Sequence, residues 1–301
     1  MTAGSETDGN RRLVLDFYRD VFWAQDLAAV ERFVTPDVRV HAPVVGEGLD
    51  AMVTSVEETF APSRPADPGE AGMPDPAILV VDGDLAAIAF YMPQARPEQA
   101  GGGAVDYFHF DAFRVRDGKV SERWPSINRA GRPTATWSKW EHGPTRPYPA
   151  GSGPEPEVAK RLAVAFYRDV FDAQDAAAAA RFVTEDYYQH AAHYPQGREG
   201  LGRLLRQLFP DGPRPAPATL TLPHVLLAAE RDIVVTAGLL PQPAPSGDGT
   251  LYPYFVYTAY AIRDGMLAEH WSGANALTPP VHTANGTSLR APGGPGRGGA
   301  G

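Results

Sequence analysis

The sequence predicts an α+β fold that occurs twice, in two domains of similar size. Residues 13–41 return at 162–190 with a constant offset of 149 positions, and the shared motifs are FYRDVF, QD, RFVT and a final histidine. Two later blocks also return: DLAAIAFYMPQ at 84–94 as DIVVTAGLLPQ at 232–242, and FRVRDGKVSERW at 113–124 as YAIRDGMLAEHW at 260–271. A period of this length is that of a whole domain and far exceeds a solenoid repeat.

Within each copy, helices come first and an antiparallel sheet follows, so we expect helices on one face of a curved sheet. Apolar residues between Leu13 and Ala24 recur with helical spacing. Asp-Gly pairs separate the later apolar runs and predict hairpin turns. In the first copy we expect further helices at 27–33 and 49–60 and strands at 38–41, 77–81, 85–92, 105–116 and 119–128. In the second copy we expect helices at 157–173 and 200–209 and strands at 219–229, 232–240, 251–263 and 266–275.

Composition gives the domain boundaries. We expect a first domain at 8–130, a linker rich in proline and glycine at 131–156, a second domain at 157–289 and a disordered tail at 290–301. The first twelve residues, MTAGSETDGNRR, lack the apolar core of a signal peptide and are interpreted as a disordered lead-in.

Charge and residue usage exclude several classes of function. The net charge is −9 and neither half has an excess of basic residues, so nucleic acid and anionic membranes are poor partners. No run of eighteen apolar residues predicts a membrane span. The chain has no cysteine, which excludes disulfides, thiolate nucleophiles and zinc–sulfur sites and favours a cytoplasmic location. No phosphate-binding loop or nucleophile elbow is present, and we expect neither a cofactor nor a metal.

The order of helix, QD turn, strand with histidine, helix and hairpins ending in RDG and a tryptophan resembles the nuclear-transport-factor-2-like superfamily. Within it the chain resembles the SnoaL-like proteins, which include polyketide cyclases. The second copy carries the sharper match, in YYQHAAHYPQGREGL, IRDGMLAEHW and ANGTSL. The resemblance implies two tandem cone-shaped α+β barrels, each a curved sheet wrapped around a long N-terminal helix with a pocket inside. Such cones pair through their sheets, so the resemblance implies an internal pseudo-dimer and leaves a further homodimer open.

In the first copy, one strand carries the candidate catalytic residues. Side chains alternate along 105–116, so Tyr107, His109, Asp111 and Phe113 share one face. The imidazole of His109 and the carboxyl group of Asp111 would lie roughly 7 Å apart, which suits an acid/base pair if that face lines the pocket.

The segment DAFRV also resembles the strand of ketosteroid isomerase that supplies an oxyanion-hole aspartate, and the QD turn places Tyr18 where that enzyme keeps a tyrosine. A buried, protonated Asp111 would then donate a hydrogen bond to an enolate together with Tyr18. The general base of that enzyme falls near Ala42, which cannot act as one. His109 is the better base by its face, and the adjacent His41 remains a candidate.

The second copy differs at these positions. Thr258 replaces Asp111, and Val256 replaces His109. The candidate catalytic residues of this copy are Tyr167, His190 and His270. The candidate substrate-binding residues of the chain are Trp124, Tyr107, Phe113, Tyr254 and Trp271.

Each candidate has a structural alternative. The tyrosines are also compatible with core packing, Asp111 with pairing to a surface arginine, and His41 and His190 with bonds to backbone carbonyls. A metal site at His190 and His193 is disfavoured because no carboxylate motif accompanies them.

Three functions remain open. The favoured one is a cofactor-free cyclase or isomerase that acts on an enolisable, polyketide-like and hydrophobic small molecule in secondary metabolism, for example antibiotic biosynthesis. The second is an epoxide hydrolase or epoxide-opening cyclase of the same fold, which would need a pair of acidic groups. The third is a non-catalytic binder. The presence of Asp111 favours acid/base chemistry in the first domain.

Overall fold

The computed structural model describes residues 3–41, 46–60, 73–91, 94–95, 104–106, 108–126, 147–190, 194–239, 241–243, 251–253, 255–274, 282–283 and 286–287. Tyr107, Tyr254, most of the predicted linker and the predicted tail lie outside these ranges. Both halves contain the predicted order of elements.

The first domain begins with helices and continues as strands. Its elements are α1 (Ala3–Phe17), the π-helical turn η1 (Tyr18–Trp23), η2 (Leu27–Ala29), α2 (Val30–Phe33), β1 (Val34–Val40), α3 (Leu49–Phe60), β2 (Ile78–Asp82), β3 (Leu85–Tyr91), β4 (Gln94–Ala95), β5 (Ala104–Val105), β6 (Phe108–Arg116) and β7 (Lys119–Pro125).

The second domain repeats that order. Its elements are α4 (Pro156–Phe166), the π-helical turn η4 (Tyr167–Asp172), η5 (Ala178–Arg181), β8 (Val183–Gln189), α5 (Gly197–Leu208), β9 (His224–Glu230), β10 (Ile233–Leu239), β11 (Gln242–Pro243), β12 (Leu251–Tyr252), β13 (Phe255–Arg263), β14 (Met266–Ala274), β15 (His282–Thr283) and β16 (Gly286–Thr287). The described helices are all too short or too polar to cross a lipid bilayer.

The repeated QD motif ends one helix and starts the next. Gln25 and Gln174 adopt positive φ angles of 55° and 51°, a conformation that stops a right-handed helix. The aspartate that follows then caps the next turn: Oδ1 of Asp26 accepts from the amides of Ala28 and Ala29 at 3.0 and 3.3 Å, and Asp175 makes the same bonds in the second domain. The motif therefore recurs for a structural reason.

The N-terminal lead-in is helical from Ala3, which corrects the prediction of disorder. Contacts with the sheets explain the difference. The side-chain amide of Asn10 donates to the carbonyl of Gly83 at 3.0 Å, and the guanidinium of Arg11 donates to the carbonyl of Leu79 at 3.2 Å. Such contacts stabilise a polar helix that its own sequence would not hold.

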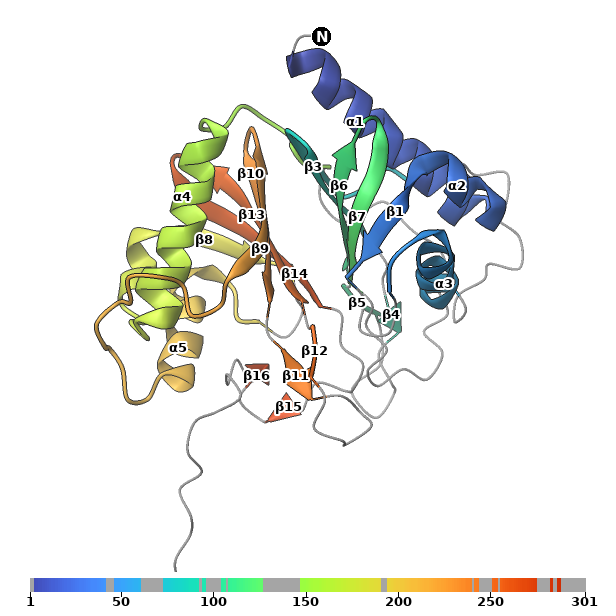
Figure 1. The fold of residues 1–301 in the computed structure, drawn as a ribbon. Helices are drawn as coiled ribbons and strands as arrows, with labels where there is room; N and C mark the ends of the chain where they lie inside the picture. Colours follow the sequence, from blue (N-terminus) through green and yellow to red (C-terminus); the bar gives the residue numbers. More distant parts are fainter. Residues whose placement is uncertain are drawn as a thin grey trace, which may run out of the picture.

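Each domain has a five-stranded sheet, with the orders β1-β7-β6-β3-β2 and β8-β14-β13-β10-β9. The pairs β1–β7 and β8–β14 are parallel, and the other neighbours are antiparallel. The predicted Asp-Gly hairpins are confirmed, since Asp117 and Gly118 have φ angles of 53° and 71° and Asp264 and Gly265 have 54° and 73°. The helices of each domain pack on one face of its sheet, and the two sheets lie between the two sets of helices (Figure 1).

The two sheets pack against each other around a shared apolar cluster to which both domains contribute. The rings of Phe110 and Tyr257, which occupy equivalent positions in β6 and β13, stack with centroids 5.5 Å apart. Each domain thus presents the same patch to the other, which is the property of a twofold interface.

The edge of this interface repeats the same symmetry. The carboxylate of Glu230 accepts from the amide of Val81 at 2.9 Å and pairs with Arg11. The carboxylate of Asp82, at the equivalent position of the first domain, accepts from the amide of Ala229 at 3.0 Å and pairs with Lys160. The two domains are therefore arranged as an internal pseudo-dimer.

Candidate functional site

Each sheet has an inner face toward its own helices and an outer face toward the other domain. On β6, Phe113 belongs to the cluster packed on α1, whereas Phe110 and Ala112 belong to the cluster between the sheets. Asp111 lies on the inner face with Phe113. His109 pairs with Phe90 across β3, and Phe90 also belongs to the inner cluster. The predicted sharing of one face by His109, Asp111 and Phe113 agrees with these positions.

Asp111 lies in a fully buried ion pair. The hydroxyl of Tyr18 donates to Oδ2 of Asp111 at 2.9 Å, and Nη2 of Arg123 lies 2.7 Å from the same oxygen. Nε of Arg123 donates to both oxygens at 3.1 and 2.9 Å, and Nη1 donates to Oγ of Ser55 at 3.2 Å. Tyr18, Asp111 and Arg123 are each 0% exposed, so these three residues are shielded from solvent.

The charge state of Asp111 follows from its partner. Burial raises the pKa of Asp111 above its ordinary value, and Arg123 and the hydroxyl of Tyr18 act against that rise. An arginine keeps its charge in proteins, so a protonated Asp111 would leave a buried cation unpaired. We therefore infer that Asp111 is ionised at neutral pH. The neutral acid expected from the sequence does not fit this arrangement, because Arg123 occupies the carboxyl group.

A β-bulge brings Arg123 to the inner face. From the Asp-Gly turn, Val115 pairs with Val120, but Arg114 pairs with Glu122 because one extra residue interrupts β7. Arg123 then lies opposite Phe113 on the inner face. Without the bulge it would lie opposite Ala112, on the face toward the other domain.

The second domain has hydroxyl and imidazole groups in place of this ion pair. The hydroxyl of Tyr167 donates to Oγ1 of Thr258, the counterpart of Asp111, at 2.7 Å. His270 stands in the place of Arg123; it stacks on Tyr260 with ring centroids 5.3 Å apart, and its Nδ1 lies 3.1 Å from Oε1 of Gln189. Tyr167 and His270 are both partly exposed, unlike their counterparts in the first domain.

A further histidine, His224, joins this cluster and was not predicted from the sequence. Its ring meets the ring of Tyr167 edge to face, with centroids 4.8 Å apart. Burial lowers the pKa of His224 to about 4. No sequence pattern indicated it, because His224 lies in a strand expected to begin at residue 219 and has no histidine counterpart in the first copy.

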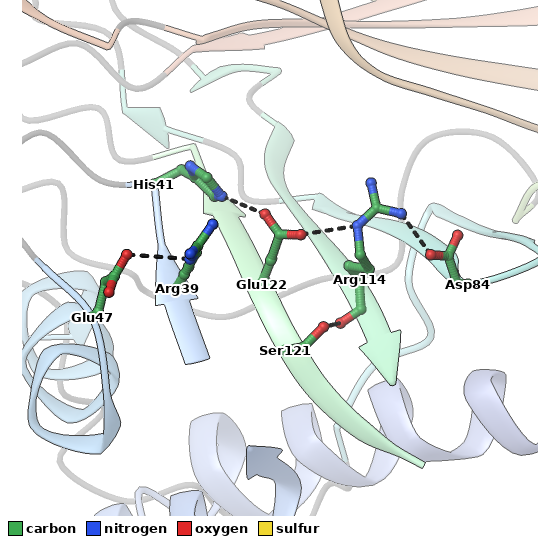
Figure 2. Close-up of polar contacts among 7 residues, drawn as sticks. All are labelled: Arg39, His41, Glu47, Asp84, Arg114, Ser121 and Glu122. Carbon is green, nitrogen blue, oxygen red and sulfur yellow. Dashed lines mark hydrogen bonds and ion pairs between the residues drawn. The ribbon is translucent and has the colours of Figure 1, made fainter. Parts of the chain in front are cut away.

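His41 and His190 lie on the outer faces, away from both inner clusters. Nε2 of His41 lies 2.8 Å from Oε2 of Glu122, and its ring stacks on Trp124 with centroids 4.6 Å apart. Figure 2 shows His41 in a surface network in which Glu122 also accepts from Arg114. This network lies on the side of the sheet opposite to the helices (Figure 2).

The second domain repeats that arrangement in a more buried form. Nε2 of His190 lies 2.8 Å from Oε2 of Glu269, and its ring stacks on Trp271 at 4.3 Å. The ring of Phe108, from the first domain, meets His190 edge to face at 5.8 Å. His190 therefore packs at the interface, and His41 lies in a surface network beside Trp124. The structure brings neither histidine to the inner face of its sheet.

The predicted substrate-binding residues also divide between the two faces. Trp124 and Trp271 belong to the cluster between the sheets, which places them outside both cones. Phe113 packs on Phe17 inside the first cone, with ring centroids 5.7 Å apart. Within the described part of the chain, no three His, Asp or Glu side chains come together as a possible metal site.

Comparisons with known proteins agree with the duplicated fold. The family model of the SnoaL-like domain matches residues 14–123 and again residues 163–270. A search of curated proteins returned no significant match. Similar solved structures include a proposed polyketide cyclase from Acidithiobacillus ferrooxidans, with 19% identity over 40% of this chain and 89% of that one and a TM-score of 0.30. A proposed SnoaL-like polyketide cyclase from a Jannaschia species has 18% identity over 42% and 92%, with a TM-score of 0.31. An LEH-like epoxide hydrolase from M. tuberculosis has 16% identity over 40% and 84%, with a TM-score of 0.29.

Proposed function

The chain belongs to the SnoaL-like domain family in both of its halves, and from that premise we propose that it is a cofactor-free cyclase or isomerase of an enolisable small molecule. We place the reaction in the second domain, where the acid and base groups are partly exposed. The proposal moves the chemistry away from the first domain, which the sequence favoured.

The observation that carries this proposal is the acceptor of each tyrosine. Tyr18 donates a hydrogen bond to the ionised carboxylate of Asp111. An ionised carboxylate can only accept, so this hydrogen bond cannot reverse. Tyr167 donates to the hydroxyl of Thr258, which can also donate. The Tyr167–Thr258 bond can therefore reverse, and the proton of Tyr167 becomes available for a substrate oxygen.

Tyr167 would act as the hydrogen-bond donor to an enolate. Burial raises the pKa of Tyr167 above its ordinary value, and bonds with Thr258, Tyr260 and Thr236 limit that rise. The phenol therefore keeps its proton at neutral pH and can donate it to a carbonyl oxygen that is gaining negative charge.

The proposed reaction needs only a proton and an electron pair to move. A base removes a proton next to a carbonyl group, the C–H electron pair forms the enolate, and Tyr167 holds the oxygen. In an isomerisation the proton returns at another carbon. In a cyclisation the enolate carbon attacks a second carbonyl of the same molecule, and the resulting alkoxide takes up the proton.

Aromatic walls suit a hydrophobic, polyketide-like substrate. Tyr167 packs against Phe171 with ring centroids 5.5 Å apart, and Phe171 packs against Phe209 at 6.1 Å. Tyr187 and Tyr260 flank His270 deeper in the same domain. Planar ligands are held by such rings through stacking and edge contacts.

Epoxide opening and simple binding are weaker candidates. The epoxide reaction expected from the sequence needs a second carboxyl group beside Asp111, and the charged neighbour there is Arg123. A binder would retain small molecules without exchanging their protons, which makes it an outcome of the test below.

Deuterium exchange tests the proposal without knowledge of the natural substrate. The chain is incubated in D2O with 1-tetralone, a bicyclic ketone, and loss of the protons beside the carbonyl is followed by proton NMR. We expect catalysed exchange that Tyr167→Phe lowers by about 10²-fold or more, as for the loss of one oxyanion donor.

Tyr18→Phe is the matched control, since it removes the same atom at the equivalent position of the first domain. We expect it to leave the exchange rate unchanged. Equal losses in both variants would contradict the assignment to the second domain. Retention of 1-tetralone without exchange would favour a binding protein.

A further inference from the structure

His224 owes its position to an irregularity in β9. Ala237 of β10 pairs with Leu226, but the next residue, Gly238, pairs with His224, so Val225 is an extra residue. Without this bulge, His224 would share the face of Leu226, which packs against the first domain. The bulge turns His224 to the inner face instead, beside Tyr167.

Gly238 supports that bulge. A side chain at this position would place its Cβ 2.5 Å from Cδ2 of Leu222, so the side chain of Leu222 would have to move. The glycine therefore allows Leu222, two residues before His224, to lie directly against β10.

The nitrogens of His224 have no partner among the described residues. Both Nδ1 and Nε2 are shielded from solvent and make no hydrogen bond there. A buried polar group without a partner is costly, and such groups are uncommon outside sites that bind or react with something. Here the ring faces the phenol proposed to hold the substrate oxygen.

We propose that His224 is the general base of the second domain, which removes the proton next to the carbonyl group whose oxygen Tyr167 binds. This inference rests on the proposed function and names a catalytic residue for it. In the step, a lone pair of the imidazole takes the α-proton and the C–H electron pair moves into the enolate. The imidazolium then returns the proton to carbon or to the new alkoxide.

His224 is better placed for this role than His270. β9 and β14 are three strand spacings apart, about 14 Å along the sheet. His224 contacts Tyr167 directly, whereas His270 stacks on Tyr260 and approaches Gln189. An α-proton lies close to its carbonyl oxygen, so the base must be a neighbour of the donor that binds this oxygen.

The electrostatic surroundings keep His224 in its basic form. Burial lowers its pKa to about 4, and the carboxylate of Asp172 on η4 acts weakly in the opposite direction. Among the described residues, Tyr167 also meets the ring, and its raised pKa keeps the phenol neutral. The imidazole is therefore free of a proton at pH 7. Bases of similar strength do remove α-protons where a buried donor holds the enolate oxygen.

The first domain has no ionisable side chain at the position equivalent to His224. Its segment before β2 reads Pro76-Ala77 at the corresponding positions, and neither side chain can carry a proton.

The test combines a deletion, its chemical rescue and a binding readout. His224→Ala and His224→Gln are compared with the wild type in the 1-tetralone exchange assay, with folding checked by circular dichroism. We expect a loss of about 10²-fold or more in both variants. Added imidazole should restore exchange in His224→Ala and not in His224→Gln, where the amide fills the space. Wild-type rates in a folded His224→Ala would overturn the proposal.

The binding readout separates this proposal from the proposed function. Nitrogen-15 NMR of histidine-labelled protein follows His224 as 2-naphthol, a planar hydroxyl compound, is added. If the wild type exchanges 1-tetralone but naphthol leaves His224 unmoved, the base lies elsewhere and the proposed function survives. If the wild type shows no exchange yet naphthol shifts His224, His224 lines a binding site and its role as a base is overturned.

Discussion

The two domains share one scaffold and differ in what faces their tyrosines. In the first domain Tyr18 faces Asp111, whose charge is fixed by Arg123. In the second domain Tyr167 faces Thr258, a neutral hydroxyl group. The comparison teaches that the residue that accepts the tyrosine's hydrogen bond decides whether the phenol can donate to a substrate instead. In the sequence, Asp111 looks more reactive than Thr258. In the structure, its carboxylate holds the proton of Tyr18 in a hydrogen bond, so this tyrosine does not donate to a substrate.

The first domain retains a clear structural role. Its sheet covers the outer face of the second sheet, and residues of both domains form the shared cluster between them. A buried ion pair is a poor source of stability compared with apolar packing, but it is severely destabilising when one partner is lost. We therefore expect substitutions at the buried polar residues of the first domain to lower the stability of the fold. We expect substitutions at the equivalent positions of the second domain to lower activity.

The largest expected effect on stability comes from Asp111→Asn. The variant leaves Arg123 as a buried, unpaired cation, so we expect a loss of about 3–5 kcal/mol in the free energy of unfolding, measured by urea denaturation.

A double variant checks the cause. Asp111→Thr combined with Arg123→His installs the residues of the second domain, and we expect it to recover most of that stability. A single variant as stable as the wild type would show that the ion pair is not fully buried. A double variant no better than the single one would point to a cause other than charge.

The next effect concerns pH and the second domain. The pKa of His224 is about 4 in the folded chain and near 6.5 in the unfolded chain, so the unfolded chain alone takes up a proton between these values. Folding stability should therefore fall as the pH falls from 6.5 to 4, by up to about 3 kcal/mol.

His224→Gln should lack this part of the acid sensitivity. The measurement is the difference in unfolding free energy between variant and wild type at pH 7 and at pH 4.5. An identical pH dependence in the two proteins would mean that His224 is solvated rather than buried.

The two tyrosines should also differ in their contribution to stability. Tyr18→Phe removes a hydrogen bond to a charged group and should cost about 1.5–3 kcal/mol, whereas Tyr167→Phe removes a bond between neutral groups and should cost about 1 kcal/mol. Calorimetric melting temperatures of the two variants provide the comparison. This order is opposite to the order expected for activity, and a reversed order of melting temperatures would contradict the assigned charge states.

The smallest effect tests the symmetry of the interface. Glu230→Gln and Asp82→Asn each remove one partly exposed charge from equivalent bonds between the domains. We expect losses of about 0.5–1 kcal/mol that are equal within error, because partly exposed ion pairs contribute little. Urea denaturation of both variants measures this, and a large loss in only one would break the symmetry.

The sequence predicted the features that depend on local order. The duplication, the turn at QD, the Asp-Gly hairpins and the shared face of Asp111 and Phe113 follow from spacing and residue type. The helical start at Ala3 could not be predicted, because contacts of Asn10 and Arg11 with the sheets stabilise it.

The partners of the candidate residues depended on β-bulges, which the sequence does not show. One extra residue turns Arg123 toward Asp111, and another turns His224 toward Tyr167. A strict alternation would place both on the outer faces. Asp111 could therefore be predicted from the sequence, but its ion pair with Arg123 and the position of His224 beside Tyr167 could not.

The most direct test of this account converts the second domain into the state of the first. The double variant Thr258→Asp and His270→Arg places the aspartate–arginine ion pair of the first domain beside Tyr167. Circular dichroism reports whether the variant folds. The measurement is its rate of deuterium exchange into 1-tetralone. The account predicts a folded protein whose exchange has fallen to the level of Tyr167→Phe. A folded double variant that exchanges at the wild-type rate would contradict it.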